Sequence, residues 1–400
     1  MSAPKKKDLL ALSSIPLIMT LGNSMLIPVL PGMRSQLNVS SFQVSLIITV
    51  YSVVAIFLIP VAGFLSDRFG RKKVIVPSLI LTGLGGLLCG IAAVWLAHAY
   101  VWILAGRFIQ GIGAAGAFPI VMPLVGDLFQ DEAQVSAGLG MIETSNTFGK
   151  VLSPILGSLL AVIVWHAPFW AIPVLCAASL IMVWLMVKVP KKQEAKPPGI
   201  PQFFASVRTL FRQKGRWLYA IFVLGGICMF VVFGTLFYLS QMLEDEHGMH
   251  GVLKGGMLAI PTAALCACSF GTGKLIGNHK KRMKWFNLSG TFLLTAATLV
   301  CAWFGEKSVL LDMVLISLSS AGVGIALPCL DAFITEGIEK EQRGTVTSFY
   351  SSMRFIGVAA GPPVASVMLK PSAGPFFYLA AGLGGVAILL SAFALKPKED

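Results

Sequence analysis

Charged residues are scarce in this sequence. Asp, Glu, Lys and Arg make up 12% of the 400 residues, about half the share in a soluble domain, while 56% are hydrophobic and the mean hydropathy is +0.81. No hydrophilic stretch is long enough to form a separate soluble domain. Apolar runs of about 20 residues, the length that crosses a bilayer, recur along the chain. The composition excludes a soluble protein and predicts an all-α polytopic membrane protein.

The sequence also lacks the marks of an enzyme or a metalloprotein. It has no Walker A motif and no nucleophile–histidine–carboxylate set, and its seven cysteines lie inside apolar runs as packing residues. The acidic stretch Glu244–Glu246, followed by His247 and His250, is interpreted as a solvated loop, with a metal site as the alternative. We therefore predict no catalytic residue, no cofactor and no metal.

Twelve transmembrane helices are predicted from the apolar runs. The first run is interpreted as a retained span rather than a signal peptide, because it is long, contains Pro28 and Pro31, and lacks a convincing cleavage site. The predicted spans are 9–31, 42–65, 74–96, 100–126, 135–160, 167–188, 217–242, 252–275, 285–304, 309–334, 344–369 and 374–395.

Basic residues are distributed unevenly between the two sides of these spans. With a cytoplasmic N-terminus, 23 of the 31 Lys and Arg residues lie on the cytoplasmic side, and only Arg34, Lys254, Lys307 and Lys370 lie outside. Because basic loops stay in the cytoplasm, we predict a multi-pass protein of the cell membrane with both termini cytoplasmic. The net charge of +13 follows from this topology, so no nucleic-acid partner is predicted.

The chain divides into two similar halves. Residues 188–216 are rich in Lys and Pro and are predicted to be a cytoplasmic linker between a six-helix bundle at 1–187 and another at 217–400. Gly63-x-Leu65 returns 210 residues later as Gly273-x-Leu275, and the Gly149 segment returns 208 residues later at Gly357. Such duplication predicts pseudo-symmetric bundles with a substrate site between them.

Four motifs connect this chain to a known family. The loop at 63–73, GFLSDRFGRKK, resembles the loop between helices 2 and 3 of the major facilitator superfamily. The first span carries LG at 21–22 and PVLP at 28–31, and the fourth carries RFIQGIGAA at 107–115. The fifth span is similar to the antiporter motif of the twelve-span drug:proton antiporters, except that Ser153 replaces a glycine.

This resemblance implies a secondary active transporter. It favours multidrug efflux, in which small amphipathic compounds leave in exchange for protons by alternating access. The alternative is a dedicated proton-coupled exporter of one metabolite, such as a siderophore or an antibiotic. An uptake symporter and a non-transporting scaffold are less favoured, because the fifth-span motif is associated with export and the gating residues are intact. The expected partners are a small-molecule substrate, protons and the lipid bilayer, and short loops favour a monomer.

A gate is predicted at the loop after the second span. Asp67 can pair with Arg71, and Arg68 or Arg71 can reach Asp127 at the inner end of the fourth span. Such a cluster would latch the cytoplasmic side and release it on rearrangement, as the resemblance also implies. The alternative is that these basic residues only set the topology.

Three ionisable residues are candidates for proton coupling. Glu143 shares one helix face with Asn146 and Lys150 inside the fifth span, which predicts that this face lines a cavity and that Glu143 accepts a proton or a cationic substrate. A static Glu143–Lys150 pair, or a Glu143 wetted from the cytoplasm, is the alternative. The resemblance implies a cavity-facing role for Arg107, which could instead snorkel to the interface. Asp312 is a candidate near the outer start of the tenth span, or an interfacial acid.

Polar and aromatic residues inside the spans are candidate substrate ligands. Lys150 and Arg354 would suit an anionic group, although Arg354 could instead hold a carboxylate such as Asp331. The aromatic candidates could alternatively face lipid or packed protein. The predicted substrate-binding set is Asn23, Asn146, Lys150, Phe148, Phe233, Tyr350 and Arg354. The predicted hinge set, chosen for close helix contact or bending, is Gly140, Gly149, Pro154, Gly157, Gly357, Gly361 and Pro362.

Overall fold

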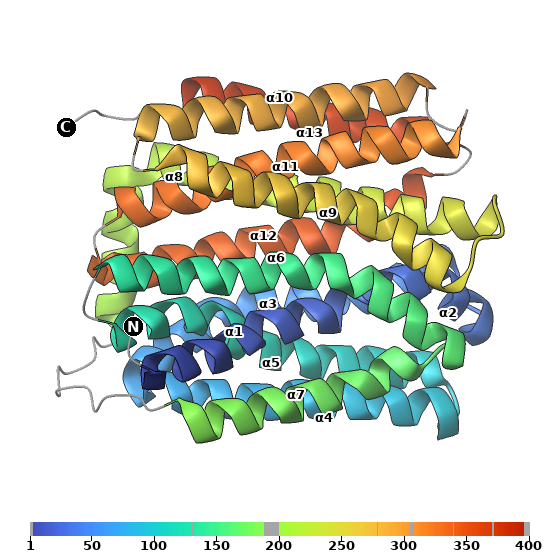
Figure 1. The fold of residues 1–400 in the computed structure, drawn as a ribbon, viewed down its shortest axis with the longest axis horizontal. Helices are drawn as coiled ribbons and strands as arrows, with labels where there is room; N and C mark the ends of the chain where they lie inside the picture. The colour runs from blue at the N-terminus through green and yellow to red at the C-terminus, as the bar shows by residue number, and fades with distance from the viewer. Residues whose placement is uncertain are drawn as a thin grey trace.

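The computed structural model describes residues 3–129, 132–187, 200–277, 279–304, 308–338, 340–369 and 372–395. This part of the chain is all-helical, and its helices run side by side along the long axis of the molecule (Figure 1). Both termini lie at one end, which we call the terminal end, and the opposite one is the far end (Figure 1). The prediction of an all-α polytopic fold is confirmed.

The predicted spans correspond to long helices. Within the described ranges, eleven segments are long and apolar enough to cross a membrane, and α12 is the twelfth helix of the bundle. α12 is less apolar because it carries five serines and threonines and Arg354 between residues 345 and 354. The helices are α1 (Ala3–Ser24), α2 (Leu30–Leu37), α3 (Ser41–Phe69), α4 (Arg71–Trp95), α5 (Ala99–Leu128), α6 (Glu132–Ile163), α7 (Ala167–Met186), α8 (Ile200–Asp245), α9 (Gly251–Ile276), α10 (Lys280–Phe304), α11 (Val309–Gly337), α12 (Lys340–Met368) and α13 (Gly374–Phe393).

The first predicted span is interrupted, which the sequence interpretation did not anticipate. α1 ends at Ser24, a 3₁₀ turn η1 follows at Ile27–Val29, and α2 begins at Leu30. The physical reason is the pair Pro28 and Pro31, since proline has no N–H with which to continue an α-helical ladder. The interruption lies at the far end, where α2 sits beside the neighbouring helices (Figure 1).

The two halves meet along two pairs of helices. α3 packs against α12, and α6 packs against α9. Figure 1 places α8, α9, α10, α11 and α13 on one side, and α1, α3, α4, α5 and α7 on the other. This is the twelve-helix arrangement of two pseudo-symmetric bundles that the internal repeat predicted.

The repeated glycines mark equivalent contacts in the two halves. A Cβ added at Gly157 would overlap the backbone of Met25, directly after α1, and one at Gly357 would overlap Gly226 in α8. The fifth helix of each half therefore packs tightly against the first, as small residues allow in membrane bundles. Gly149 and Gly361 also approach a neighbouring backbone, whereas Gly140 has no atom within 4 Å of its added Cβ. Pro154 and Pro362 lie inside α6 and α12.

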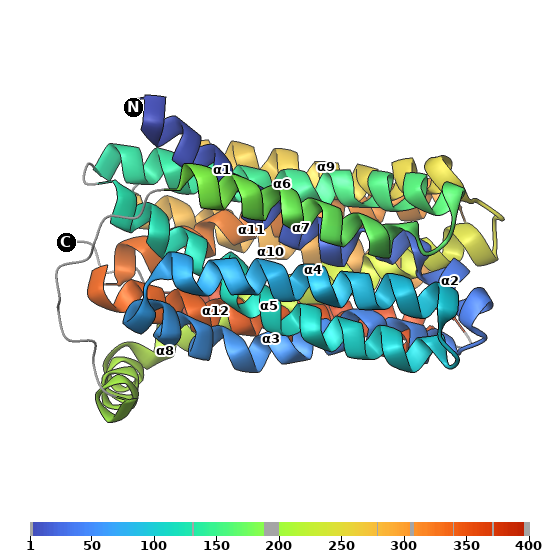
Figure 2. The same ribbon diagram turned by 90° about the horizontal axis from the view of Figure 1, so that it is seen from below.

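The predicted linker is partly outside the described residues. Residues 188–199 lie outside the described residues, whereas residues 200–216 are the beginning of the 46-residue helix α8. Figure 2 shows these first turns of α8 projecting away from the bundle at the terminal end. Nearby, Lys72 Nζ donates to the carbonyls of Trp184 and Val187 at 3.0 and 2.8 Å, and so caps the end of α7.

Candidate functional site

A central cavity lies between the two halves. It has an empty volume of about 640 Å³, part of it open to the surroundings, and its wall comes from α1, α3, α5 and α6 of the first half and α8 and α12 of the second. The lining residues are Met19, Thr20, Asn23, Ser24, Tyr51, Ala114, Phe118, Asn146, Lys150, Met229, Phe233, Ser351, Arg354, Phe355 and Val358. The cavity thus combines two cations and two amides with aromatic rings.

Five of the seven predicted substrate residues line this cavity, namely Asn23, Asn146, Lys150, Phe233 and Arg354. Of the other two, Tyr350 is buried behind the wall, where the Arg354 guanidinium lies 5.6 Å from the centre of its ring. Phe148 does not line the cavity, and 52% of its surface is exposed. Since each residue turns about 100° around a helix, Phe148 points about 200° away from Asn146 and Lys150.

The Lys150 ammonium group is buried without a hydrogen bond to any described residue. The alternative of a static pair between Lys150 and Glu143 is not what the structure has, although both residues are described. Glu143 instead uses Oε1 to accept from Asn146 Nδ2 at 3.2 Å, and Thr20 donates to Asn146 Oδ1 at 2.6 Å. One oxygen of Glu143, Oε2, is likewise buried without a hydrogen bond to a described residue.

Four charges face one another around the cavity. Arg354 Nη1 lies 3.8 Å from Asp331 Oδ1, which matches the alternative pairing considered for Arg354. Lys150 interacts electrostatically with Arg354, Glu143 and Asp331. The two acids balance the two cations, yet only the cations belong to the cavity wall. A ligand in the cavity would therefore meet positive charge first.

Arg107 is buried behind the cavity rather than exposed to it. Its guanidinium donates to the carbonyl of Ile47 at 2.8 Å, to Gln110 Oε1 at 2.6 Å and to Asn23 Oδ1, and it lies 4.4 Å from the ring centre of Tyr51. The alternative in which Arg107 extends to the membrane interface is wrong, because Arg107 is fully buried. Asn23 and Tyr51 line the cavity, so Arg107 positions two of its wall residues.

Asp312 is also buried away from the central cavity. The residue is only 1% exposed, so it is not an acid at the bundle surface. Tyr238 donates a hydrogen bond to Asp312 Oδ2 at 2.9 Å, which joins α8 to the start of α11 within the second half. No wall residue of the central cavity is part of this contact.

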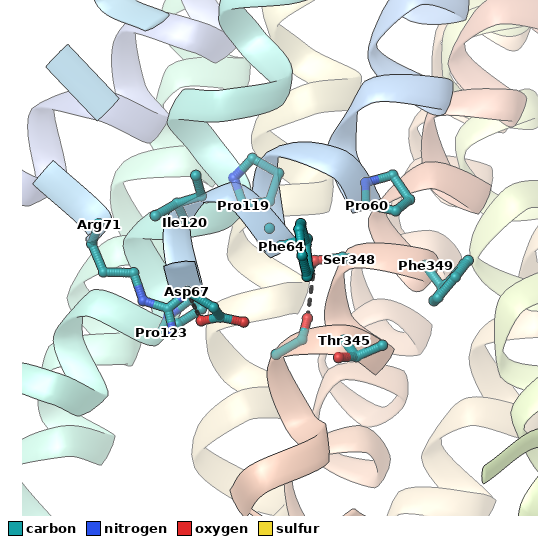
Figure 3. Close-up of a pocket in the computed structure, with 12 residues that line it drawn as sticks. Pro60, Phe64, Asp67, Arg71, Pro119, Ile120, Pro123, Thr345, Ser348 and Phe349 are labelled. Atoms are coloured by element: carbon teal, nitrogen blue, oxygen red, sulfur yellow. Dashed lines mark hydrogen bonds and ion pairs between the residues drawn. The ribbon is translucent and has the colours of Figure 1, made fainter. Parts of the chain in front are cut away.

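The predicted gate residues meet at the terminal end. Arg71 pairs with Asp67 at 2.7 Å and with Asp127 at 3.2 Å, so one guanidinium joins α3 and α5. Figure 3 shows Asp67 and Arg71 at a small cavity whose opposite wall includes Thr345 and Ser348 of α12. Arg68 takes no part in these ion pairs and lies over the Phe69 ring. The cluster is therefore next to the interface between the halves.

A second set of ion pairs at the far end was missed by the sequence interpretation. Arg34 forms a bidentate pair with Asp245 at 2.8 and 2.9 Å, and Lys254 pairs with Glu244 at 2.6 Å. Both acids lie in the last turn of α8 rather than in a loop, and the solvated interpretation is wrong for Glu244, whereas Asp245 is exposed. A basic residue three positions inside an apolar span, Lys254, was the available signal, since such a charge needs a partner.

Comparison with known proteins gives one family. A model described as the Major Facilitator Superfamily matches residues 12–362 and 288–400. The chain is 53% identical over 395 residues to the Bacillibactin exporter of Bacillus subtilis (strain 168), covering 98% of both proteins. It is 28% identical over 407 residues to Multidrug efflux protein YfmO of the same strain, covering 99% of this chain and 93% of that protein. A solved D-xylose-proton symporter has the same fold, with a TM-score of 0.82, 12% identity and 98% of each chain covered.

Proposed function

Because the chain belongs to the Major Facilitator Superfamily, we propose that it exports one anionic, aromatic metabolite in exchange for protons by alternating access. The observation that carries this is the Lys150 ammonium group, buried at the cavity wall without a hydrogen bond to a described residue. A buried cation in this condition is costly for the fold. An anionic ligand would complete its hydrogen bonding through short, charge-assisted contacts.

The rest of the cavity supports an anionic substrate with rings. Arg354 supplies a second cation whose contact with Asp331, at 3.8 Å, is long enough to leave its donors available for exchange. Phe118, Phe233 and Phe355 line the same cavity and offer surfaces for stacking or apolar contact. A cationic compound would be repelled by Lys150 and Arg354 in this space.

We name bacillibactin, or a siderophore close to it, as the substrate. The support is the 53% identity to the Bacillibactin exporter over nearly the whole of both chains, together with the cationic cavity. Multidrug efflux is the second candidate, supported by the 28% identity to Multidrug efflux protein YfmO and by the aromatic wall. The two cations favour the dedicated exporter.

Protons are the proposed counter-substrate, and Glu143 is the proposed carrier. Its Oε2 is buried without a hydrogen bond to a described residue, so an added proton displaces no donor there. Its Oε1 reaches the cavity wall through Asn146, which places the carboxyl one contact away from the substrate. Asp67, Arg71 and Asp127 are the proposed inner latch.

The proposed location is the cell membrane, with both termini in the cytoplasm and the protein acting as a monomer. The uneven distribution of Lys and Arg supports this orientation. The terminal end is then the cytoplasmic side and the far end is the outside. Substrate would enter the central cavity from the terminal end and leave at the far end.

The substrate class is tested in everted membrane vesicles with an acidic interior. We expect uptake of bacillibactin that depends on the protein and on the pH gradient, because export from a cell becomes uptake into such vesicles. A cationic dye and a fluoroquinolone should not be taken up. Uptake of several cationic compounds would instead establish multidrug efflux, and loss of preloaded bacillibactin would indicate an uptake symporter.

The inner latch gives a separate prediction. Asp67→Asn should slow turnover by up to about fivefold, because a partly exposed ion pair is worth at most about 1 kcal/mol. Binding of bacillibactin to the purified protein should be unchanged, since Asp67 is not part of the central cavity wall. Lys73→Gln removes an exposed charge from the same loop and serves as the control. Altered affinity with normal turnover would contradict the latch.

A further inference from the structure

A second cavity lies beyond Lys150 towards the far end. It shares Ser24, Lys150 and Phe233 with the central cavity, so it begins where that cavity ends. Its empty volume is about 400 Å³, part of it open to the surroundings, and Lys150 is the one charged residue among the described residues of its wall. The remaining wall is mainly apolar, with Leu236 and Leu258 among its residues. We call this space the outer chamber.

Hydrogen bonds between the halves lie next to this chamber, towards the far end. Ile27 lines the chamber, and its carbonyl accepts from Ser240 Oγ at 3.0 Å. Lys254 lies one helical turn beyond Leu258, and its Nζ donates to the carbonyl of Pro28 at 2.7 Å. The same ammonium donates to Glu244 Oε2 at 2.6 Å, and the Lys254 side chain is 2% exposed in this arrangement.

The proline turn changes how the carbonyl of Ile27 is used. Pro31 has no N–H to donate to this carbonyl, four residues earlier, so it accepts no α-helical bond and instead accepts from the Leu30 N–H of the 3₁₀ turn and from Ser240 Oγ. The 3₁₀ turn η1 presents the carbonyls of Ile27 and Pro28 to α8 and α9 of the other half. The turn that contains the PVLP segment thus supplies the acceptors of contacts between the two halves.

The far-end contacts differ in burial. The Arg34–Asp245 pair has side chains that are 29% and 37% exposed, so water can replace it at little cost. Lys254 is buried, and breaking its contacts has a larger effect. Lys254 and Glu244 both belong to the second half, so their ion pair can survive separation of the halves, and only the bond to Pro28 must break. Opening therefore leaves no buried charge unpaired.

We propose that Lys254, Glu244 and the Ile27–Pro28 carbonyls form the outer gate, and that the outer chamber is the route by which substrate leaves Lys150. The orientation is the one given under the proposed function. The gate itself requires alternating access and does not depend on which compound is carried. The gate opens when the contacts that Ser240 and Lys254 make with η1 break, so that η1 separates from the second half of the protein.

The gate is tested by labelling from outside in the absence of substrate. Thr262→Cys places a thiol in the chamber wall, two turns inward from Lys254, with little change in size. Adding Lys254→Met should raise its rate of reaction with a membrane-impermeant maleimide in intact cells at least tenfold. Ser240→Ala, which removes one uncharged hydrogen bond, should raise the rate by a smaller factor.

Two controls define the outcome. Lys274→Met removes an exposed lysine of the same helix and should leave the rate unchanged, and the chain without Thr262→Cys reports labelling of its own cysteines. Rates equal to those of the Thr262→Cys parent in both the Lys254→Met and Ser240→Ala chains would overturn the gate. If Lys254→Met does not fold, Ser240→Ala decides alone. Since no substrate is present, a negative result here leaves the anionic substrate unaffected, and failure of the vesicle assay leaves the gate unaffected.

Discussion

Replacing Lys150 with methionine is expected to weaken binding of bacillibactin by about 10- to 100-fold. A hydrogen bond to a charged group contributes about 1.5–3 kcal/mol, and each 1.4 kcal/mol is about tenfold in affinity. Methionine fills similar space but offers neither charge nor donors. The dissociation constant is measured on purified protein by calorimetry or fluorescence, with Lys150→Arg as the variant that keeps the charge.

Thermal stability separates a ligand-binding lysine from a structural one. The Lys150 ammonium is buried without a hydrogen bond to a described residue, so Lys150→Met should leave the melting temperature unchanged or raise it. A lysine needed for the fold would lower it. Lys274→Met is the matched control, since Lys274 is exposed on α9 and outside both cavities. Unchanged affinity in Lys150→Met would contradict the anionic site.

Replacing Glu143 with glutamine is expected to abolish exchange driven by a pH gradient while leaving insertion and folding intact. Glutamine has the shape of the protonated acid and cannot release a proton. In everted vesicles, pH-driven uptake should fall at least tenfold, which corresponds to about 1.4 kcal/mol. Glu246→Gln, an exposed acid at the far end, is the control. Full pH-driven uptake in Glu143→Gln would show that Glu143 does not carry the exchanged proton.

The sign of proton exchange on binding tests antiport directly. An exchanger must bind the proton and the substrate alternately, so bacillibactin should release protons from the purified parent near neutral pH and none from Glu143→Gln. Direct repulsion between a bound anion and ionised Glu143 acts in the opposite sense, because it favours protonation. Release would therefore indicate that a rearrangement couples the two, and proton uptake would contradict antiport.

The polar residues inside apolar spans were the most informative part of the sequence. Asn146, Lys150 and Arg354 could be assigned to a cavity because each is costly against lipid, and all three line the central cavity. Phe148 could not be assigned in this way, because an aromatic ring is equally stable against lipid and against protein. Arg107 was recognised as unusual, but its carbonyl and amide partners come from α1 and α3, which only the fold brings together.

The sequence alone determined the membrane class, the twelve helices, the duplicated halves and the basic loop at 63–73. These depend on hydrophobicity, segment length and local motifs, which are properties of neighbouring residues. The tertiary structure decided which charges meet. Arg34 and Asp245 are 211 positions apart, and Lys254 meets the Pro28 carbonyl across 226 positions, so no local pattern joins them. The packing of the two halves brings the proline turn and the acidic segment together at the far end. There the buried Lys254 ammonium needs acceptors, and the Pro28 carbonyl and Glu244 supply them.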